Sequence, residues 1–166
     1  MMKKSIFVVM SILISAVVFA QPQQQQQPVF KVGAVIPRFN FRNIIDSVPY
    51  SNANLEKNKK TIFIYFGPDC GHCINFTKKL TDSISLVNNT QIVMVSSSEF
   101  SHMKKFYDDN NLSNFQNISM ARDADYFFIT YYSVRQFPAA YIYNSKGKFV
   151  KSFESEFSIA ELAETN

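Results

Sequence analysis

The chain has 166 residues, of which 46% are hydrophobic and 18% charged, with 17 Phe, no Trp and two Cys. This composition excludes a disordered or fibrous protein, and the length suits one domain with its own hydrophobic core. The formal net charge of +4 falls to +2 without Lys3 and Lys4, which argues against nucleic-acid binding because that requires a concentrated basic surface. Two cysteines also exclude a disulfide-dense scaffold and a four-thiolate zinc site.

Residues 1–20 have the pattern of an export signal. Lys3 and Lys4 precede an apolar run that ends at Phe19, and Ala20 suits the position before a cleavage site. The run is shorter than the roughly 20 residues that span a bilayer, and retention as a membrane anchor is the alternative. We therefore expect an exported protein, in a bacterial periplasm, where disulfides form and persist.

The glutamine- and proline-rich residues 21–28 have no means of burying a core, so they indicate a flexible linker before a folded domain over residues 29–166. Residues 29–41 combine β-branched and aromatic residues with turn formers, which predicts a short edge strand. The continuous apolar run over residues 61–66 predicts a strand buried on both faces, and it ends in the turn sequence of residues 67–69.

The rest of the chain alternates between strand and helix patterns. Strands are expected at residues 91–95, 118–121, 139–143 and 148–153, and helices at residues 73–87, 98–109 (with Ser98 as N-cap), 123–134 and after the capping box of Ser158 and Glu161. A hairpin turn at residues 144–147 joins the last two strands. This order predicts an α/β fold in which helices cover both faces of a central sheet.

The two cysteines, Cys70 and Cys73, stand three positions apart at the first turn of a predicted helix, directly after a strand and a turn. The positive end of the helix favours the thiolate form of the exposed first sulfur. The second sulfur, one turn along, is placed to close a disulfide with the first. Such a pair can attack a partner disulfide, hold it as a mixed disulfide and resolve it.

The two residues between the cysteines tune this chemistry. Gly71 permits close approach of a substrate backbone, and His72 beside the thiolate stabilises the reduced form. Two other interpretations of the pair are open. Half of a zinc site has the same spacing, but the chain contains no second Cys pair. A purely structural disulfide would close too small a loop to restrict the unfolded chain much.

The chain resembles the thioredoxin-fold thiol–disulfide oxidoreductases, in particular the exported TlpA/ResA-like branch of the redoxins, over about residues 31–153. The resemblance is carried by the segments VG…PRF, YFGPDCGHC, YSVRQFP and YIYNSKGK, which begin at residues 32, 65, 132 and 141 respectively. It implies a three-layer fold with a mixed sheet, Cys70 and Cys73 as catalytic residues, and a cis bond at Pro138 facing them. It also implies that the backbone of Phe137 binds an extended substrate beside Pro138.

The chain departs from the family pattern at the positions of its acidic residues. Thioredoxin has a buried acid where this chain has Ile64, and the ResA-like reductases have a glutamate where this chain has Phe76. Asp69 replaces the tryptophan that usually precedes the first cysteine. A proton-shuttling acid is therefore missing from both expected positions.

The sequence thus predicts an exported enzyme that reduces, forms or isomerises disulfides and uses no metal or other cofactor. The direction of electron flow stays open, because the resemblance of the Gly71-His72 dipeptide to that of protein disulfide isomerases favours oxidation or isomerisation, whereas the overall similarity favours reduction. The expected partners are exported proteins with thiols or disulfides and a redox protein that supplies or removes electrons. A peroxiredoxin-like peroxidase and a redox-inert binding module are the alternatives; the peroxidase expects a Thr-x-x-Cys nucleophile, and Cys70 has Gly67 at the position of that threonine.

Overall fold

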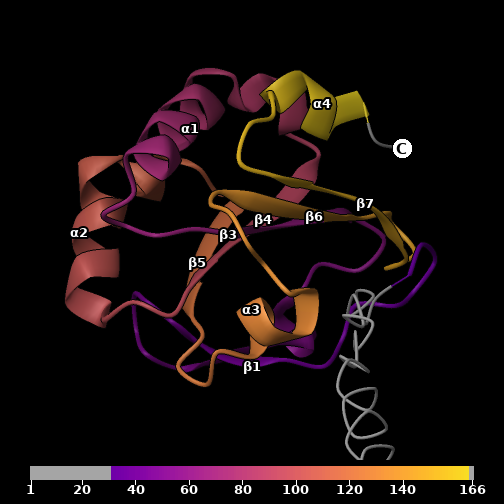
Figure 1. Ribbon diagram of the computed structural model, residues 1–166, viewed down its shortest axis with the longest axis horizontal. Coiled ribbons are helices and arrows are strands. Elements are labelled where there is room, and N and C mark those ends of the chain that lie inside the picture. Colours follow the sequence, from indigo (N-terminus) through magenta and orange to yellow (C-terminus); the bar gives the residue numbers. More distant parts are fainter. Residues whose placement is uncertain (1–30, 165–166) are drawn as a thin grey trace, which may run out of the picture.

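The computed structural model describes residues 31–164, so the predicted export signal and linker lie outside the described residues. Four α-helices and seven strands follow one another along this part of the chain (Figure 1). In order they are β1 (Asn40–Asn43), β2 (Pro49–Ser51), β3 (Lys60–Tyr65), α1 (Gly71–Asp82), β4 (Thr90–Ser96), α2 (Phe100–Asp109), β5 (Ile118–Arg122), α3 (Phe127–Tyr132), β6 (Ala139–Tyr143), β7 (Phe149–Glu154) and α4 (Ile159–Glu164).

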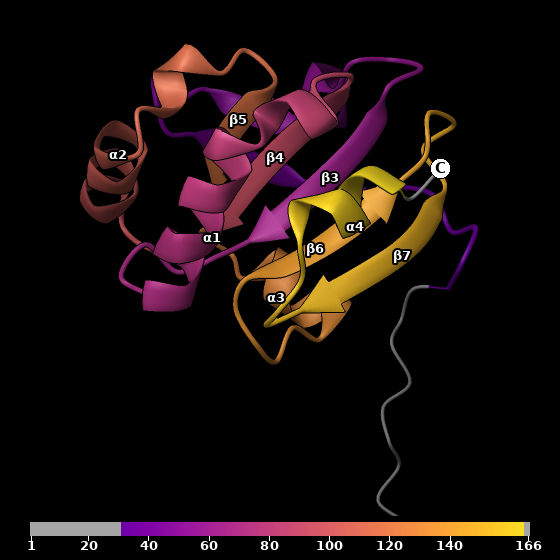
Figure 2. The same cartoon turned by 90° about the horizontal axis from the view of Figure 1, so that it is seen from above.

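The seven strands form one mixed sheet in the order β2-β1-β5-β4-β3-β6-β7. The inner pairs β3–β4 and β4–β5 are parallel, whereas β3–β6, β6–β7, β1–β5 and β1–β2 are antiparallel. Figure 2 shows β3 beside β4 in the middle of the sheet, with the β6–β7 hairpin on one side. The predicted α/β fold with a mixed sheet is confirmed.

Helices cover both faces of the sheet, as predicted (Figure 1). On one face, α1, α2 and α4 enclose a first hydrophobic cluster that contains Cys73, Leu80, Met103, Phe106 and Leu162. On the other face, α3 packs its buried Phe128 and Tyr132 against a second cluster made largely of aromatic side chains. The two clusters form the two halves of a three-layer domain.

The central strand β3 is buried on both faces, as its unbroken apolar run predicts. Ile62 and Ile64 point into the first cluster, whereas Phe63 and Tyr65 point into the second. This alternation follows from the two-residue period of a strand. Residues 62–65 are therefore all apolar or aromatic, whereas the first two residues of β3, Lys60 and Thr61, are polar.

The N-terminal part of the sheet differs from the prediction. Of the short edge strand expected within residues 29–41, the structure has one antiparallel bridge, between Val35 and Lys148 beside β7 at the end of the sheet. The first full strand begins only at Asn40, and it is not an edge strand because β2 pairs with its outer side. β2 has three residues and begins at Pro49. A proline cannot donate a hydrogen bond to a neighbouring strand. A three-residue segment that begins with proline therefore gives little indication of a strand in the sequence.

Three helix boundaries also differ from the prediction. The helix that carries the cysteines ends at Asp82, and a separate 3₁₀ turn covers residues 84–87. The N-cap of α2 is Glu99 and not Ser98, and its side chain makes no capping hydrogen bond. α3 begins only at Phe127, because Tyr126 adopts a left-handed conformation with φ 55°.

The C-terminal elements agree closely with the prediction. Gly147 has a φ of 67° in the turn between β6 and β7, a conformation that glycine adopts without strain. The capping box before α4 is present: the backbone N–H of Ser158 donates to Glu161 Oε2 at 2.8 Å, and the N–H of Glu161 donates to Ser158 Oγ at 3.2 Å. Between residues 31 and 164, we find no helix with the length and apolar character needed to cross a membrane.

We predict that Asp123→Ala lowers the free energy of unfolding by about 1–3 kcal/mol, the cost of leaving buried donors unpaired. Asp123 is 1% exposed, and its carboxylate accepts the N–H groups of Phe127 and Phe128 at 3.0 and 2.7 Å. Urea unfolding measures the change. Asp125→Ala is the matched control, because Asp125 is exposed two residues further on. Equal losses in the two variants would contradict this account of α3.

Candidate active site

The cysteine pair lies where the central strand β3 leaves the sheet. Just after the end of β3, the backbone N–H of Phe66 donates a hydrogen bond to Val95 O of β4 at 3.0 Å. A tight turn follows, in which the N–H of Cys70 donates to Gly67 O at 3.1 Å. Cys70 then has an extended conformation (φ −86°, ψ 116°) and is the N-cap of α1. The sequence therefore places Cys70 at the end of the helix that carries positive partial charge, as predicted.

The two sulfurs differ in their access to solvent. Cys70 is half-buried at the start of α1, whereas Cys73 is completely buried, one turn into the helix. Residues three apart on a helix lie on the same face, so the buried thiol stands directly behind the accessible one. Of the two cysteines, only Cys70 is therefore partly exposed to solvent.

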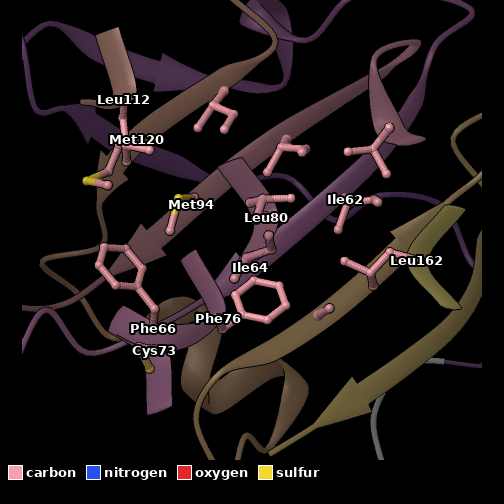
Figure 3. Close-up of a cluster of buried hydrophobic side chains, with 14 of the residues drawn as sticks. Ile62, Ile64, Phe66, Cys73, Phe76, Leu80, Met94, Leu112, Met120 and Leu162 are labelled. Atoms are coloured by element: carbon pink, nitrogen blue, oxygen red, sulfur yellow. The ribbon is translucent and has the colours of Figure 1, made fainter. Parts of the chain in front are cut away.

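Burial changes the acidity of the second thiol. Desolvation raises the pKa of Cys73 to about 12, while a backbone hydrogen bond from Gly67 opposes this rise and the neighbouring Cys70 adds to it. In Figure 3, Cys73 lies at one end of the first hydrophobic cluster, beside Phe66 and Phe76. The thiol therefore holds its proton firmly in the reduced protein.

Gly67 is the glycine that the site requires. A Cβ on Gly67 would lie 3.3 Å from Cys70 Cβ, closer than side-chain carbons normally pack, and 3.9 Å from the ring of Phe137, so an added side chain would force Cys70 to shift slightly. A Cβ on Gly71 would meet no atom within 4 Å. The space at Gly71 is open to solvent, which agrees with the predicted approach of a substrate backbone there.

The bond between Phe137 and Pro138 is cis, as the resemblance implies. The ring of Phe137 lies 5.4 Å from that of Tyr65 and packs beside Gly67, so this peptide borders the cysteine turn. The carbonyl of Pro138 accepts the N–H of Ser155 at 2.9 Å. Among the backbone hydrogen bonds of residues 31–164 that lie outside helices and strands, none involves Phe137.

A groove of about 780 Å³ runs along α1 from His72 to Ser83, opposite the segment that joins β7 to α4, and neither cysteine lines it. His72 is exposed and lines this groove, with Phe76 and Phe157 among its other lining residues. The rings of Phe76 and Phe157 pack with their centroids 4.8 Å apart. The influence of His72 on the thiolate stays a prediction.

The structure also shows one contact that the sequence analysis missed. The carboxylate of Asp69, directly before Cys70, lies 3.1 Å from Nδ1 of His102 on α2. The two side chains are 81% and 59% exposed, so the contact adds little to stability. It joins α2 to the cysteine turn across 33 positions of sequence, and no local pattern reveals a contact of that range.

The buried neighbours of Cys73 include no carboxylate from the two expected positions. Ile64 and Phe76 are both buried in the same cluster as Cys73. In the described part of the chain, the single buried acid is Asp123, which is bound to α3 on the opposite face of the sheet. Residues 31–164 also hold no group of three or more His, Cys, Asp and Glu side chains that could bind a metal ion.

Comparisons with known proteins identify the fold. Neither a protein-family model nor a curated protein sequence matches the chain. Solved structures do match it at low identity. One is a secreted disulfide oxidoreductase of Mycobacterium tuberculosis homologous to E. coli DsbE, with 18% identity, a TM-score of 0.62, and 75% of this chain and 93% of that chain covered.

Two further neighbours have the same architecture. StoA from Bacillus subtilis has 19% identity and a TM-score of 0.61, with 79% of this chain and 97% of that chain covered. The peroxidoxin BcpB from M. tuberculosis has 15% identity and a TM-score of 0.66, with 81% and 92% covered. The structural neighbours are thioredoxin-like and redoxin proteins, and the chain has a thioredoxin-like fold.

The two glycines of the site give a matched pair of variants. We predict that Gly67→Ala lowers the free energy of unfolding by about 1–3 kcal/mol, because the added methyl group overpacks the contact with Cys70. Gly71→Ala is expected to be neutral or to stabilise by about 0.4–1 kcal/mol, since the new methyl meets open space and the unfolded chain loses freedom. Urea unfolding of the reduced proteins measures both; a loss for Gly71→Ala equal to that for Gly67→Ala would contradict the geometry.

Proposed function

We propose that this chain is an exported thiol–disulfide oxidoreductase that uses Cys70 and Cys73 as one reversible redox pair. The observation that carries the proposal is the unequal burial of the two thiols at the start of α1, with Cys70 half-buried and Cys73 completely buried. A structural disulfide needs no accessible sulfur, whereas a thiol that exchanges with other proteins does. The thioredoxin-like fold supports the same conclusion.

The reaction proceeds through a mixed disulfide. The Cys70 thiolate attacks one sulfur of a partner disulfide, and the other partner sulfur leaves as a thiolate that takes up a proton. Cys73 then gives up its proton and attacks Cys70 Sγ, which releases the second partner thiol. The partner disulfide is reduced to two thiols and the pair is oxidised to a Cys70–Cys73 disulfide; the reverse sequence forms a disulfide in the partner.

The partner is an extended protein segment with a cysteine, in keeping with the open backbone groups at Phe137. One N–H and one C=O at this position can pair with a chain that lies along the cis bond. Main-chain hydrogen bonds of this kind give affinity without strong sequence preference. A second redox protein, acting on the same pair, restores the starting oxidation state.

Export rests on residues 1–20 and on the compartment of the structural neighbours. The secreted M. tuberculosis oxidoreductase and an exposed lipoprotein thioredoxin of Streptococcus pneumoniae share the fold. An oxidising compartment suits a pair that must be reset by disulfide exchange. The reduction potential of the pair, titrated against glutathione, distinguishes a reductant of exported proteins from an oxidant.

Substitution of each cysteine tests the proposal. We expect Cys70→Ser to abolish both insulin reduction and the oxidative refolding of a disulfide protein, because the accessible nucleophile is removed. We expect Cys73→Ser to accumulate mixed disulfides with exported proteins, because the second step is blocked. Undiminished catalysis by Cys70→Ser would overturn the proposal. Absence of mixed disulfides would favour a binding module, and enzymatic peroxide consumption would favour a peroxidase.

The raised pKa of Cys73 gives a pH prediction. When the reduced protein meets a chromogenic aromatic disulfide, Cys70 releases the first aromatic thiolate and Cys73 releases the second. Because only the thiolate attacks, the second release is expected to accelerate about tenfold per pH unit from neutral pH to about pH 10. It is expected to level off only well above neutral pH, because desolvation, the largest cause of the raised pKa of Cys73, remains when Cys70 is bonded to the aromatic thiol. Stopped-flow absorbance follows both phases, and a plateau of the second phase near neutral pH would contradict the burial of Cys73.

A further inference from the structure

The second step of the proposed reaction places a negative charge where the surroundings are apolar. Cys73 must become a thiolate before it attacks Cys70, and it is completely buried among Ile64, Phe66, Phe76 and Leu80. An anion in such surroundings is strongly disfavoured unless a hydrogen-bond donor stabilises it. The backbone of Gly67 is one such donor, and a further donor close to this sulfur would speed the step.

Thr77 is the one polar side chain on the buried face of α1. It is 0% exposed, and that face is otherwise formed by Cys73, Phe76 and Leu80. Within residues 31–164, the Thr77 hydroxyl is the single buried side-chain N or O atom without a hydrogen-bond partner. A buried unpaired hydroxyl costs about 1–3 kcal/mol in a protein, so its presence in this core requires an explanation.

Thr77 lies about one turn beyond Cys73 on the buried face of α1. Residues four apart on a helix are neighbours on one face, with Cβ atoms about 5–6 Å apart. Helical side chains lean toward the N-terminus, so Thr77 covers the turn that contains Cys73. A helical threonine often donates its proton to the carbonyl four residues before it. Thr77 makes no such bond here, so its hydroxyl proton is uncommitted.

We propose that the Thr77 hydroxyl, unpaired in the reduced protein, donates a hydrogen bond to the Cys73 thiolate during resolution of the mixed disulfide, directly or through one water molecule. The step is balanced: the Cys73 proton goes to solvent, the Cys73 thiolate forms the bond to Cys70 Sγ, and the Cys70–partner bond breaks to release the partner thiolate. Thr77 keeps its own proton throughout, so it acts as a donor and not as a base.

Charge-assisted hydrogen bonds are about twice as strong as neutral ones, so the donor stabilises the thiolate more than the thiol. The difference lowers the barrier of the second step and leaves the first unchanged, because Cys70 meets its partner outside the core. The inference rests on the proposed function, since it assigns a residue to one of its two steps.

Thr77→Val separates this role from a structural one. Valine retains the shape of threonine and removes the donor, and it also removes the unpaired hydroxyl from the core. We expect an unchanged or increased free energy of unfolding together with a slower second release of aromatic thiolate. The expected slowing is about tenfold or more, as for the loss of a hydrogen bond to a charged group. The first release is expected to keep its rate, and the pH profile of the second is expected to move upward by about one unit.

Thr77→Ser and Thr77→Ala form the matched pair, since both lack the methyl group and only serine keeps the hydroxyl. The second-phase rate of the Thr77→Ser variant is expected to lie within about threefold of the wild-type rate. The second-phase rate of the Thr77→Ala variant is expected to be about tenfold lower than that of Thr77→Ser. Equal second-phase rates in serine and alanine variants would overturn the inference, as would equal slowing of both phases by Thr77→Val. A wild-type protein with no second phase would overturn the proposed function itself, so the two failures are distinguishable.

Discussion

The central strand β3 pairs with β4 on one side and with β6 on the other, and this pairing determines where the parts of the candidate active site lie. Tyr65, the last residue of β3, pairs with Val95 of β4 on one side and with Ala139 of β6 on the other. The turn that follows Tyr65 therefore lies beside the cis-Pro138, at the end of β3. A slip of one residue in either ladder would turn Ile64 and Tyr65 to the wrong clusters, so burial on both faces holds the register. The packing of the two hydrophobic clusters thus determines how Cys70 and Pro138 lie relative to each other.

The core and the chemistry also share residues at the start of α1. Cys73 is part of the first cluster, and Phe137 packs against both clusters at the end of the sheet. Because these groups are held by packing, the accessible Cys70 is presented without a long loop; the turn from Gly67 to Cys70 closes with one hydrogen bond. Rigid placement of this kind reduces the reorganisation that each exchange step requires.

The hydrophobic periodicity and the turn residues of the sequence were sufficient to predict the elements whose structure depends on residues close together in the chain. The unbroken run of β3, the helical spacing after Cys70 and the capping box of Ser158 and Glu161 all appear in the structure as expected, because each depends on neighbours in sequence. The contact of Asp69 with His102 and the unpaired hydroxyl of Thr77 depend on packing between distant segments. The cis bond at Pro138 was predictable only through the family resemblance, since a proline before a strand is usually trans.

In the proposed exchange reaction, the apolar setting of Cys73 affects the two chemical steps in opposite ways. Burial keeps this thiol protonated, so the reduced pair presents a single reactive sulfur and does not lose both protons together. The same burial opposes the thiolate needed for resolution, and neither Ile64 nor Phe76 can take up its proton. With the backbone of Gly67 as one donor to this sulfur, a second donor on α1 would stabilise the anion without placing a permanent charge in the core. A hydroxyl satisfies both requirements: it is neutral while the thiol is protonated, and it can turn toward the sulfur once the charge forms.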